Sequence, residues 1–209
     1  MSEDSKVPEV VRVIGIDPST TNMGICIIDV DLTQRTPFKL VYVNTIKGDK
    51  VLYDIPTQFD DTAATGVLAR CYGLARALGE IIDIYLTDWS EKIGTFFKKV
   101  VTGIIEDNFL GASPGTFKQL IQCVSLLEQQ FISRGIHVSS VLPNPAKEVV
   151  GAHFKGSTKE DVQAGVIAYD HLDSTGFDLA AIDDHSADAT AIALYRCEIM
   201  ARHHGVLEA

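Results

Sequence analysis

Two apolar runs near the N-terminus are separated by a short polar segment. The first run reads VRVIGI at 11–16, and the second reads ICIIDV at 25–30. Runs rich in β-branched residues favour strands, and the DPSTTNMG between them is typical of a tight turn. We therefore expect a β-hairpin with Asp17 at the end of its first strand. A third run, FKLVYV at 38–43, is expected to extend the hairpin into an antiparallel meander.

Beyond the meander, helix-spaced apolar positions alternate with short apolar runs. In chain order we expect a helix at 62–86, a strand at 100–105, a helix at 114–134, a strand at 138–142 and helices at about 158–172 and 185–203. Ser157 and Glu160 have the spacing of a capping box for the helix near 158. This order predicts an α/β fold, one mixed five-stranded sheet flanked by helices. We assign a single domain to 11–204, with tails at 1–10 and 205–209.

The composition is that of a folded globular protein. With 209 residues, 46% of them hydrophobic and 22% charged, the chain has enough apolar material for one domain with a buried core. No apolar run approaches the roughly 20 residues of a membrane-spanning helix, and MSEDSKVPEV lacks the apolar core of a secretory signal. The four cysteines form no C-x-x-C motif, so neither a disulfide framework nor a zinc site is indicated. We expect a cytoplasmic protein without a membrane partner.

Acidic residues outnumber basic ones, but the imbalance is not uniform. The whole chain has a net charge of −10, unlike a typical DNA-binding domain. The segment 91–160, however, carries eight basic and six acidic side chains and is therefore net positive. Because salt screens charges beyond roughly 10 Å, a local basic patch there remains able to bind a polyanion. The net charge alone therefore excludes no nucleic-acid function.

Acidic residues stand at the ends of two predicted core strands and at the start of the last helix. Asp17 follows the first strand, Glu106 follows the strand at 100–105, and Asp188 lies one turn after His185. Residues at i and i+3 share a helix face, so His185 and Asp188 are expected to point the same way. Carboxylates bind hard divalent cations, and two such ions about 4 Å apart promote phosphodiester hydrolysis. Each residue alone fits an ordinary cap or turn, so the combination is what indicates a metal site.

Four motifs of this chain occur in the order found in a known nuclease family. They are GIDPS at 15–19, IIED at 104–107, GSTKEDV at 156–162 and HSADATAIAL at 185–194. Together they resemble the RuvC family of Holliday junction resolvases, a branch of the ribonuclease H-like fold, from about Val11 to Ala201. Ser19 stands where that family usually has glycine. The long interval between Asp17 and Glu106 suits a divergent, phage-type member.

The resemblance implies roles for individual residues. The metal-binding catalytic positions of the family correspond to Asp17, Glu106, His185 and Asp188. Asp184 is a further candidate beside them, and Lys159 is expected to steady the charge that develops on the phosphate. The residues expected to contact DNA are Phe109, Lys118, Lys147, Lys155 and Lys159. Phe109 matches the aromatic residue that projects towards the junction centre in this family.

The resemblance also implies an activity. We expect a Mg²⁺-dependent crossover junction endodeoxyribonuclease that acts in DNA recombination and repair and leaves a 5′-phosphate. Each active site is expected to hold two Mg²⁺ ions, for which Mn²⁺ substitutes. The expected partners are branched DNA, above all a four-way junction, and a second copy of the chain in a homodimer. We expect no nucleotide cofactor, and a location at the nucleoid or, for a viral protein, in the host cytoplasm.

A related nuclease role, on RNA or on forks, flaps and other branched DNA, remains open at this point, as do two functions of other classes. The segment GIDPSTTNMG at 15–24 also resembles the first phosphate loop of actin-like sugar kinases and ATPases, although those proteins need two such lobes. The non-enzymatic alternative is a protein that binds branched DNA without cleaving it. Tight ATP binding without nuclease activity would favour the first alternative. Junction binding without cleavage would favour the second.

Overall fold

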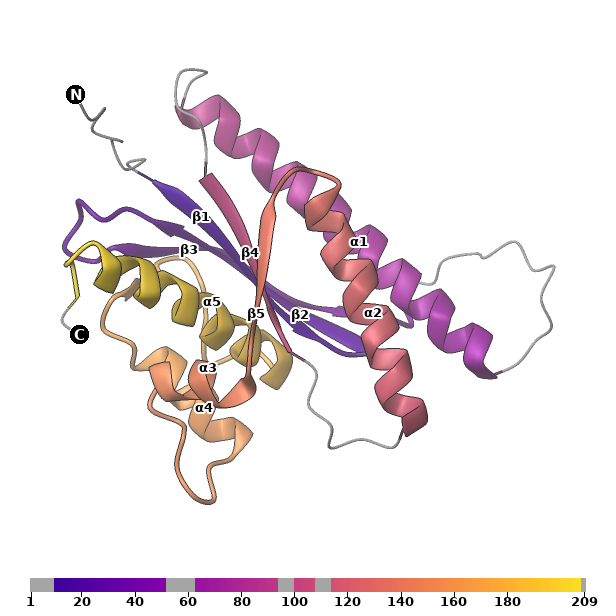
Figure 1. Ribbon diagram of the computed structural model, residues 1–209. Helices are drawn as coiled ribbons and strands as arrows, with labels where there is room; N and C mark the ends of the chain where they lie inside the picture. The colour runs from indigo at the N-terminus through magenta and orange to yellow at the C-terminus, as the bar shows by residue number, and fades with distance from the viewer. Residues whose placement is uncertain (1–9, 52–62, 94–99, 108–113, 208–209) are drawn as a thin grey trace.

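The computed structural model describes residues 10–51, 63–93, 100–107 and 114–207, which form a six-stranded sheet in the order β5-β4-β1-β2-β3-β6 (Figure 1). The strands are β1 (Val11–Pro18), β2 (Asn22–Val30), β3 (Phe38–Lys47), β4 (Val100–Glu106), β5 (His137–Val141) and β6 (Leu172–Asp173). The helices are α1 (Ala63–Ile93), α2 (Pro114–Ile132), α3 (Pro143–Val149), α4 (Lys159–Ile167) and α5 (Asp184–His203). None of the helices in these ranges is long and apolar enough to cross a membrane.

The first three strands form the predicted antiparallel meander. β1 pairs with β2 and β2 pairs with β3, so that Asp17 lies opposite Gly24 and Gly24 lies opposite Thr45. β4 and β5 are added in parallel on the other side of β1. The predicted α/β fold with a mixed sheet is confirmed, and the five long strands are the predicted ones. The structure adds a sixth strand, because β6 pairs with β3 over only two residues, too few for a periodic pattern.

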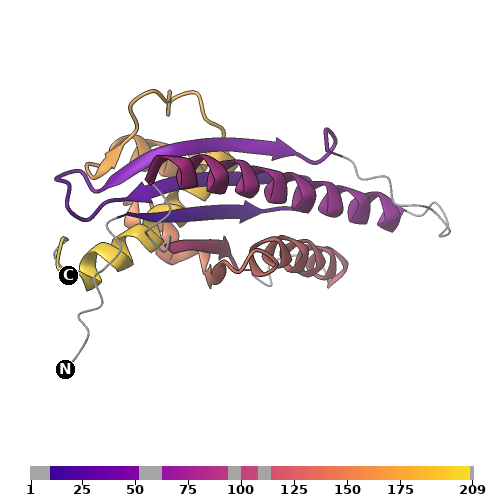
Figure 2. The ribbon, with the colours of Figure 1, turned by 90° about the horizontal axis from the view of Figure 1, so that it is seen from above.

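The helices cover the two faces of the sheet separately. Alternate residues of β1 point to opposite faces. Ile14 and Ile16 belong to the core shared with α1 and α2, whereas Val13 belongs to the core shared with α5. The short helices α3 and α4 pack against α5 on this second face (Figure 1, Figure 2). By the same alternation, Asp17 lies on the face of the sheet that α5 covers.

Two of the helices differ from the sequence-based expectation. α1 continues to Ile93, seven residues beyond its predicted end at 86, and α4 ends at Ile167 instead of near 172. α3 is an addition. It begins with Pro143 and Pro145 just after β5, and proline is favoured in the first turn of a helix, where its missing N–H is not needed.

The cap of α4 lies one residue later than predicted. Thr158, not Ser157, is the N-cap residue, and its backbone N–H donates to the Asp161 carboxylate at 2.7 Å. The sequence STKED contains two overlapping capping patterns, and the structure uses the second. As a result, Lys159 is the first residue of α4.

Close packing of α5 on the sheet depends on glycines in β1 and β2. A Cβ atom added to Gly24 would lie 2.0 Å from the His185 carbonyl oxygen. One added to Gly15 would lie 2.6 Å from the Ala189 carbonyl oxygen and 2.7 Å from the Ala193 Cβ. There is no space for a side chain at either position, so the start of α5 rests directly on the ends of β1 and β2.

Gly24→Ala is expected to destabilise the protein, because the added methyl group must push α5 away from the sheet. Overpacking of this kind costs about 1–3 kcal/mol, which for a chain of this size lowers Tm by roughly 2–12 °C. Differential scanning fluorimetry measures the change. The matched control is Gly66→Ala, since a Cβ atom at Gly66 meets nothing within 4 Å. Equal Tm values for the two variants would contradict the close contact at Gly24.

Candidate active site

Two acidic side chains meet where β1 and β4 end. Ile16 pairs with Ile105, so the next residues of these parallel strands, Asp17 and Glu106, are neighbours. Ile16 and Ile105 point into the core under α1 and α2, and the side chains of Asp17 and Glu106 therefore point to the α5 face. Asp17 is buried, with 7% of its surface exposed. The strand register alone thus places two carboxyl groups side by side.

A polar network fixes the first turn of α5. Asp183 caps the helix by accepting a hydrogen bond from the Ser186 backbone N–H at 3.0 Å. The Thr45 hydroxyl on β3 donates to the Asp183 carboxylate at 2.5 Å and lies 2.8 Å from Ser186 Oγ. This network orients the start of the helix, which carries His185 and Asp188 on one face.

Thr45→Val is expected to loosen the start of α5, because valine keeps the shape of threonine but makes no hydrogen bond to Asp183 or Ser186. The loss is expected to cost about 1 kcal/mol in the free energy of unfolding. A positioning residue of this kind typically changes activity by about 10–100-fold. Thr45→Ser, which keeps the hydroxyl, serves as the control in urea unfolding and in cleavage assays. If valine and serine behaved alike, the network would have no role in orienting the site.

Asp17 and His185 are in direct contact. His185 Nδ1 and Asp17 Oδ2 are 2.6 Å apart. This hydrogen bond is the largest cause of the raised pKa of His185, and the charges of Asp17, Asp184 and Asp183 act in the same direction. Burial opposes them. The contact joins the end of β1 to the start of α5 and orients the imidazole ring.

Glu106 and Asp188 belong to the same cluster. The pKa of Glu106 is raised to about 8, chiefly by burial and then by the charges of Asp17 and Asp188 and a hydrogen bond to Asp17. Burial likewise raises the pKa of Asp188 to about 6, with a contribution from the charge of Asp17. Carboxylates repel one another in this way only at short range. The structure therefore brings all four predicted metal-site residues together: Asp17, Glu106, His185 and Asp188.

Two lysines lie at the edge of this acidic cluster. The positive charge of Lys147, in the last turn of α3, opposes the rise in pKa of both Glu106 and Asp188. The charge of Lys159, at the start of α4, does the same for Asp188. Lys159 also forms an ion pair with Asp184, the further candidate on α5. Both lysines thus contribute positive charge at the acidic cluster.

Of the three other residues predicted to contact DNA, the structure describes two. Lys155 is exposed in the connection between α3 and α4. Lys118 is exposed on α2, which covers the opposite face of the sheet from α5. Phe109 lies outside the described residues. Contacts of these three residues with DNA stay predictions.

The chemistry of the cluster suits a divalent cation. Three carboxylates and one imidazole supply the oxygen and nitrogen donors that Mg²⁺ or Mn²⁺ accepts. In the part of the chain that the structure describes, however, no group of three or more His, Cys, Asp or Glu residues is already spaced to hold a metal ion. Asp17 forms hydrogen bonds with both His185 and Glu106.

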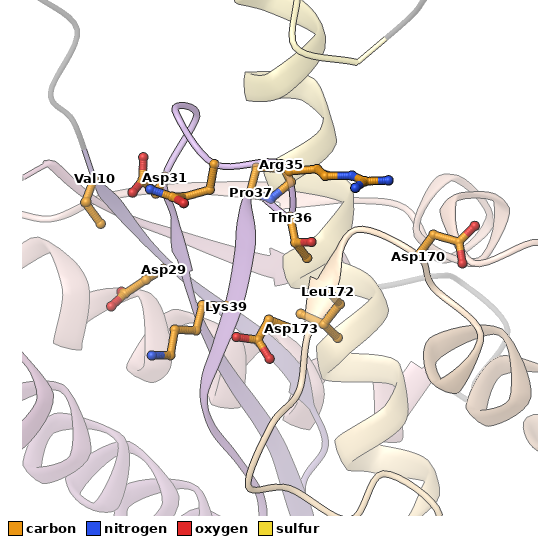
Figure 3. A pocket seen from close by; sticks show the side chains of 11 residues that line it. Val10, Asp29, Asp31, Arg35, Thr36, Pro37, Lys39, Asp170, Leu172 and Asp173 are labelled. Carbon is orange, nitrogen blue, oxygen red and sulfur yellow. The ribbon is translucent and has the colours of Figure 1, made fainter.

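A separate cavity of about 860 Å³ lies at the opposite end of the sheet (Figure 3). Its lining includes Asp29, Arg35, Lys39 and Asp173. Another lining residue, Val10, directly precedes the start of β1, whereas Asp17 lies near the other end of that strand. The sequence patterns gave no indication of this cavity, and it is distinct from the carboxylate cluster.

The residues that position the site were not predicted from the sequence. Asp183 and Ser186 do show the i, i+3 spacing of an N-cap, so this spacing could have identified their part of the network. No sequence pattern could have identified Thr45, because its role depends on the pairing of β3 with β2 and on the approach of α5. Gly24 looked like an ordinary turn residue until the contact with His185 was known.

The chain is similar to solved structures, although no protein-family model and no curated protein sequence matches it. RuvC from Thermus thermophilus aligns with a TM-score of 0.58 and 18% identity, over 94% of this chain and 98% of that chain. T. thermophilus RuvC in complex with a Holliday junction substrate aligns with a TM-score of 0.57 and 17% identity, over 94% and 97%. The yeast mitochondrial Holliday junction resolvase Ydc2 aligns with a TM-score of 0.59 and 14% identity, over 96% and 84%.

These similarities extend over nearly the whole chain at low sequence identity, so they establish the fold. An alignment of this extent compares the order of the strands and the placement of the helices over nearly the whole chain. The chain therefore has the ribonuclease H-like fold of the RuvC and Ydc2 Holliday junction resolvases.

Proposed function

We propose that this chain is a Mg²⁺-dependent endonuclease that cleaves branched DNA, with the four-way junction as its principal substrate. The observation that supports the proposal most strongly is the cluster of Asp17, Glu106, His185 and Asp188, which are distant in sequence and adjacent in space. The charges of Lys147 and Lys159 act on the cluster, and positive charge near the site favours binding of a phosphodiester. The likeness in fold to junction resolvases points to the same class of substrate.

Each side chain of the site has a distinct task in the proposed reaction. Asp17, Glu106 and Asp188 supply carboxylate oxygens that would hold Mg²⁺, and bound Mg²⁺ would activate water and stabilise negative charge on the phosphate. His185, oriented by its hydrogen bond to Asp17, positions the attacking water or completes the ligand set. Lys159 supplies a positive charge that steadies the charge developing on the phosphate. The products would carry a 5′-phosphate and a 3′-hydroxyl.

A four-way junction requires cuts in two opposed strands. One of the similar structures is a RuvC protein in complex with a Holliday junction substrate. We propose that this chain acts as a homodimer, so that one active site reaches each strand. Sedimentation velocity of the free protein and of its complex with a junction tests the stoichiometry. Two chains per junction are expected, and one chain per junction would contradict the proposal.

A substrate panel tests the activity. Linear duplex, flap, fork and four-way DNA of matched length, each labelled at one 5′ end, are incubated with the protein in Mg²⁺, in Mn²⁺ and in EDTA. We expect cuts near the branch of the four-way junction in either metal, little cleavage of the duplex, and no cleavage in EDTA. Junction binding without cleavage in both metals would indicate a binding protein instead. Tight ATP binding without DNA cleavage would indicate a phosphate-loop ATPase.

A further inference from the structure

The connection between α3 and α4 presents an aromatic side chain to solvent. Phe154 has 54% of its surface exposed, and its neighbours His153 and Lys155 are exposed as well. Phenylalanine is one of the residues most often fully buried in folded proteins, so an exposed ring between two polar side chains is unusual. No other large apolar residue occurs in the sequence from Gly151 to Asp161. The exposed ring is therefore not the edge of a wider apolar patch within this segment.

The backbone holds Phe154 in this position. The Ser157 backbone N–H donates to the Phe154 carbonyl oxygen at 3.1 Å, and Gly156, with φ of 88°, occupies the third position of the turn. A positive φ at that position is the mark of a type II turn, which favours glycine there. On the other side, Ala152 is buried, and its N–H donates to the Lys147 carbonyl oxygen at 2.9 Å. Both ends of the turn are thus anchored.

In the sequence, the turn lies between the two lysines that border the acidic cluster. Lys147 is in the last turn of α3, before Phe154, and Lys159 begins α4, after it. In Figure 1 this connection extends away from the sheet beside α4. The exposed ring thus lies on the connection that joins these two lysines, next to the exposed side chain of Lys155.

We propose that residues 153–157 form a DNA contact in which the Phe154 ring stacks on an unpaired or unstacked base at the branch point. This inference rests on the function proposed above and assigns a recognition element to the same site. Aromatic rings next to basic side chains bind single-stranded nucleic acid by stacking on bases while the charges contact phosphates. Lys155 and Lys159 are the lysines nearest to Phe154 in the sequence, and both are exposed. A protein-binding patch would instead need a continuous apolar surface.

The test compares Phe154→Leu, which keeps an apolar side chain but removes the ring, with Phe154→Tyr, which keeps the ring. Binding is measured in EDTA on four-way junctions that carry 2-aminopurine at single positions around the branch. We expect Phe154→Leu to weaken junction binding about tenfold and to abolish fluorescence quenching at one or two positions, since stacking on one base contributes that much. Phe154→Tyr is expected to bind and quench like the unaltered protein. The control is Ile132→Ala, an exposed apolar residue at the end of α2.

Each outcome of this test has a definite meaning. If the unaltered protein binds junctions and Phe154→Leu binds them equally well with equal quenching, the stacking contact is wrong while the proposed function stands. If the unaltered protein shows no preference for junctions over duplex, the proposed function and this inference both fail. If Phe154→Leu changes the sedimentation coefficient of the DNA-free protein, the exposed ring belongs to a contact between subunits and the inference is overturned.

Discussion

Asp188→Asn is expected to reduce the rate of junction cleavage in Mg²⁺ by about a hundred- to a thousandfold, as the loss of one preorganised electrostatic group in an active site does. Asparagine has the same shape as aspartate but no negative charge, so it is a poor ligand for Mg²⁺. Asp188 faces Asp17 and Glu106 in the cluster, and its carboxylate is one of the three that would share the cation. Single-turnover cleavage of a labelled four-way junction measures the effect.

The same variant is expected to bind the junction at least as well as the unaltered protein, because one negative charge near the DNA has been removed. A loss of cleavage with binding retained would separate a catalytic effect from unfolding. The matched control is Asp49→Asn, since Asp49 is an exposed aspartate outside the cluster. Asp17→Asn and Glu106→Gln are expected to act like Asp188→Asn. Full activity in any of the three variants would contradict the assignment of the site.

Glu106→Gln is expected to make the metal-free protein more stable at alkaline pH while it abolishes cleavage. The folded-state pKa of Glu106 is raised to about 8, mainly by burial, from an ordinary value near 4.5. Between these two pH values the folded chain keeps a proton that the unfolded chain has released, so stability falls as pH rises from about 4.5 to 8. Glutamine carries no such charge. In EDTA at pH 9 we expect its Tm to exceed that of the unaltered protein by about 5 °C or more.

Divalent cations should reverse this difference. Mg²⁺ binds the ionised carboxylates of the folded state and is therefore expected to raise the Tm of the unaltered protein at pH 9, but not that of Glu106→Gln. The control is Glu148→Gln, an exposed glutamate on α3, which should match the unaltered protein with and without Mg²⁺. Equal Tm profiles for Glu106→Gln and the unaltered protein from pH 5 to 9 would mean that Glu106 is not held in an acidic cluster.

Much of the architecture followed from the sequence because its signals are local. The two apolar runs of β1 and β2, separated by a polar turn, predict the hairpin and place Asp17 at a strand end, which the structure confirms. The i, i+3 spacing of His185 and Asp188 likewise places both side chains on one helix face. That Asp17 and Glu106 are neighbours, however, depends on the parallel pairing of β1 with β4, which no local pattern encodes. The resemblance to a known family supplied that step.

The parts that the sequence did not reveal depend on contacts between distant segments or on competing local signals. Thr45 reaches Asp183 across 138 positions of sequence, and Gly24 is required because α5 lies directly above it. The two overlapping capping patterns at the start of α4 have similar strength, and only the packed structure shows that Thr158 is the cap. Phe154 looked like any other aromatic residue until its exposure was known.

An anomalous diffraction measurement on crystals grown at pH 8.5 and soaked in Mn²⁺ tests the central claim most directly. At this pH the carboxyl group of Glu106, with its pKa of about 8, is largely ionised and able to accept the ion. We predict an anomalous peak between the side chains of Asp17, Glu106 and Asp188, and its absence in Glu106→Gln crystals treated in the same way. A fully soaked crystal with no peak at this cluster, or with Mn²⁺ bound only elsewhere, would contradict the assignment of a metal-dependent active site.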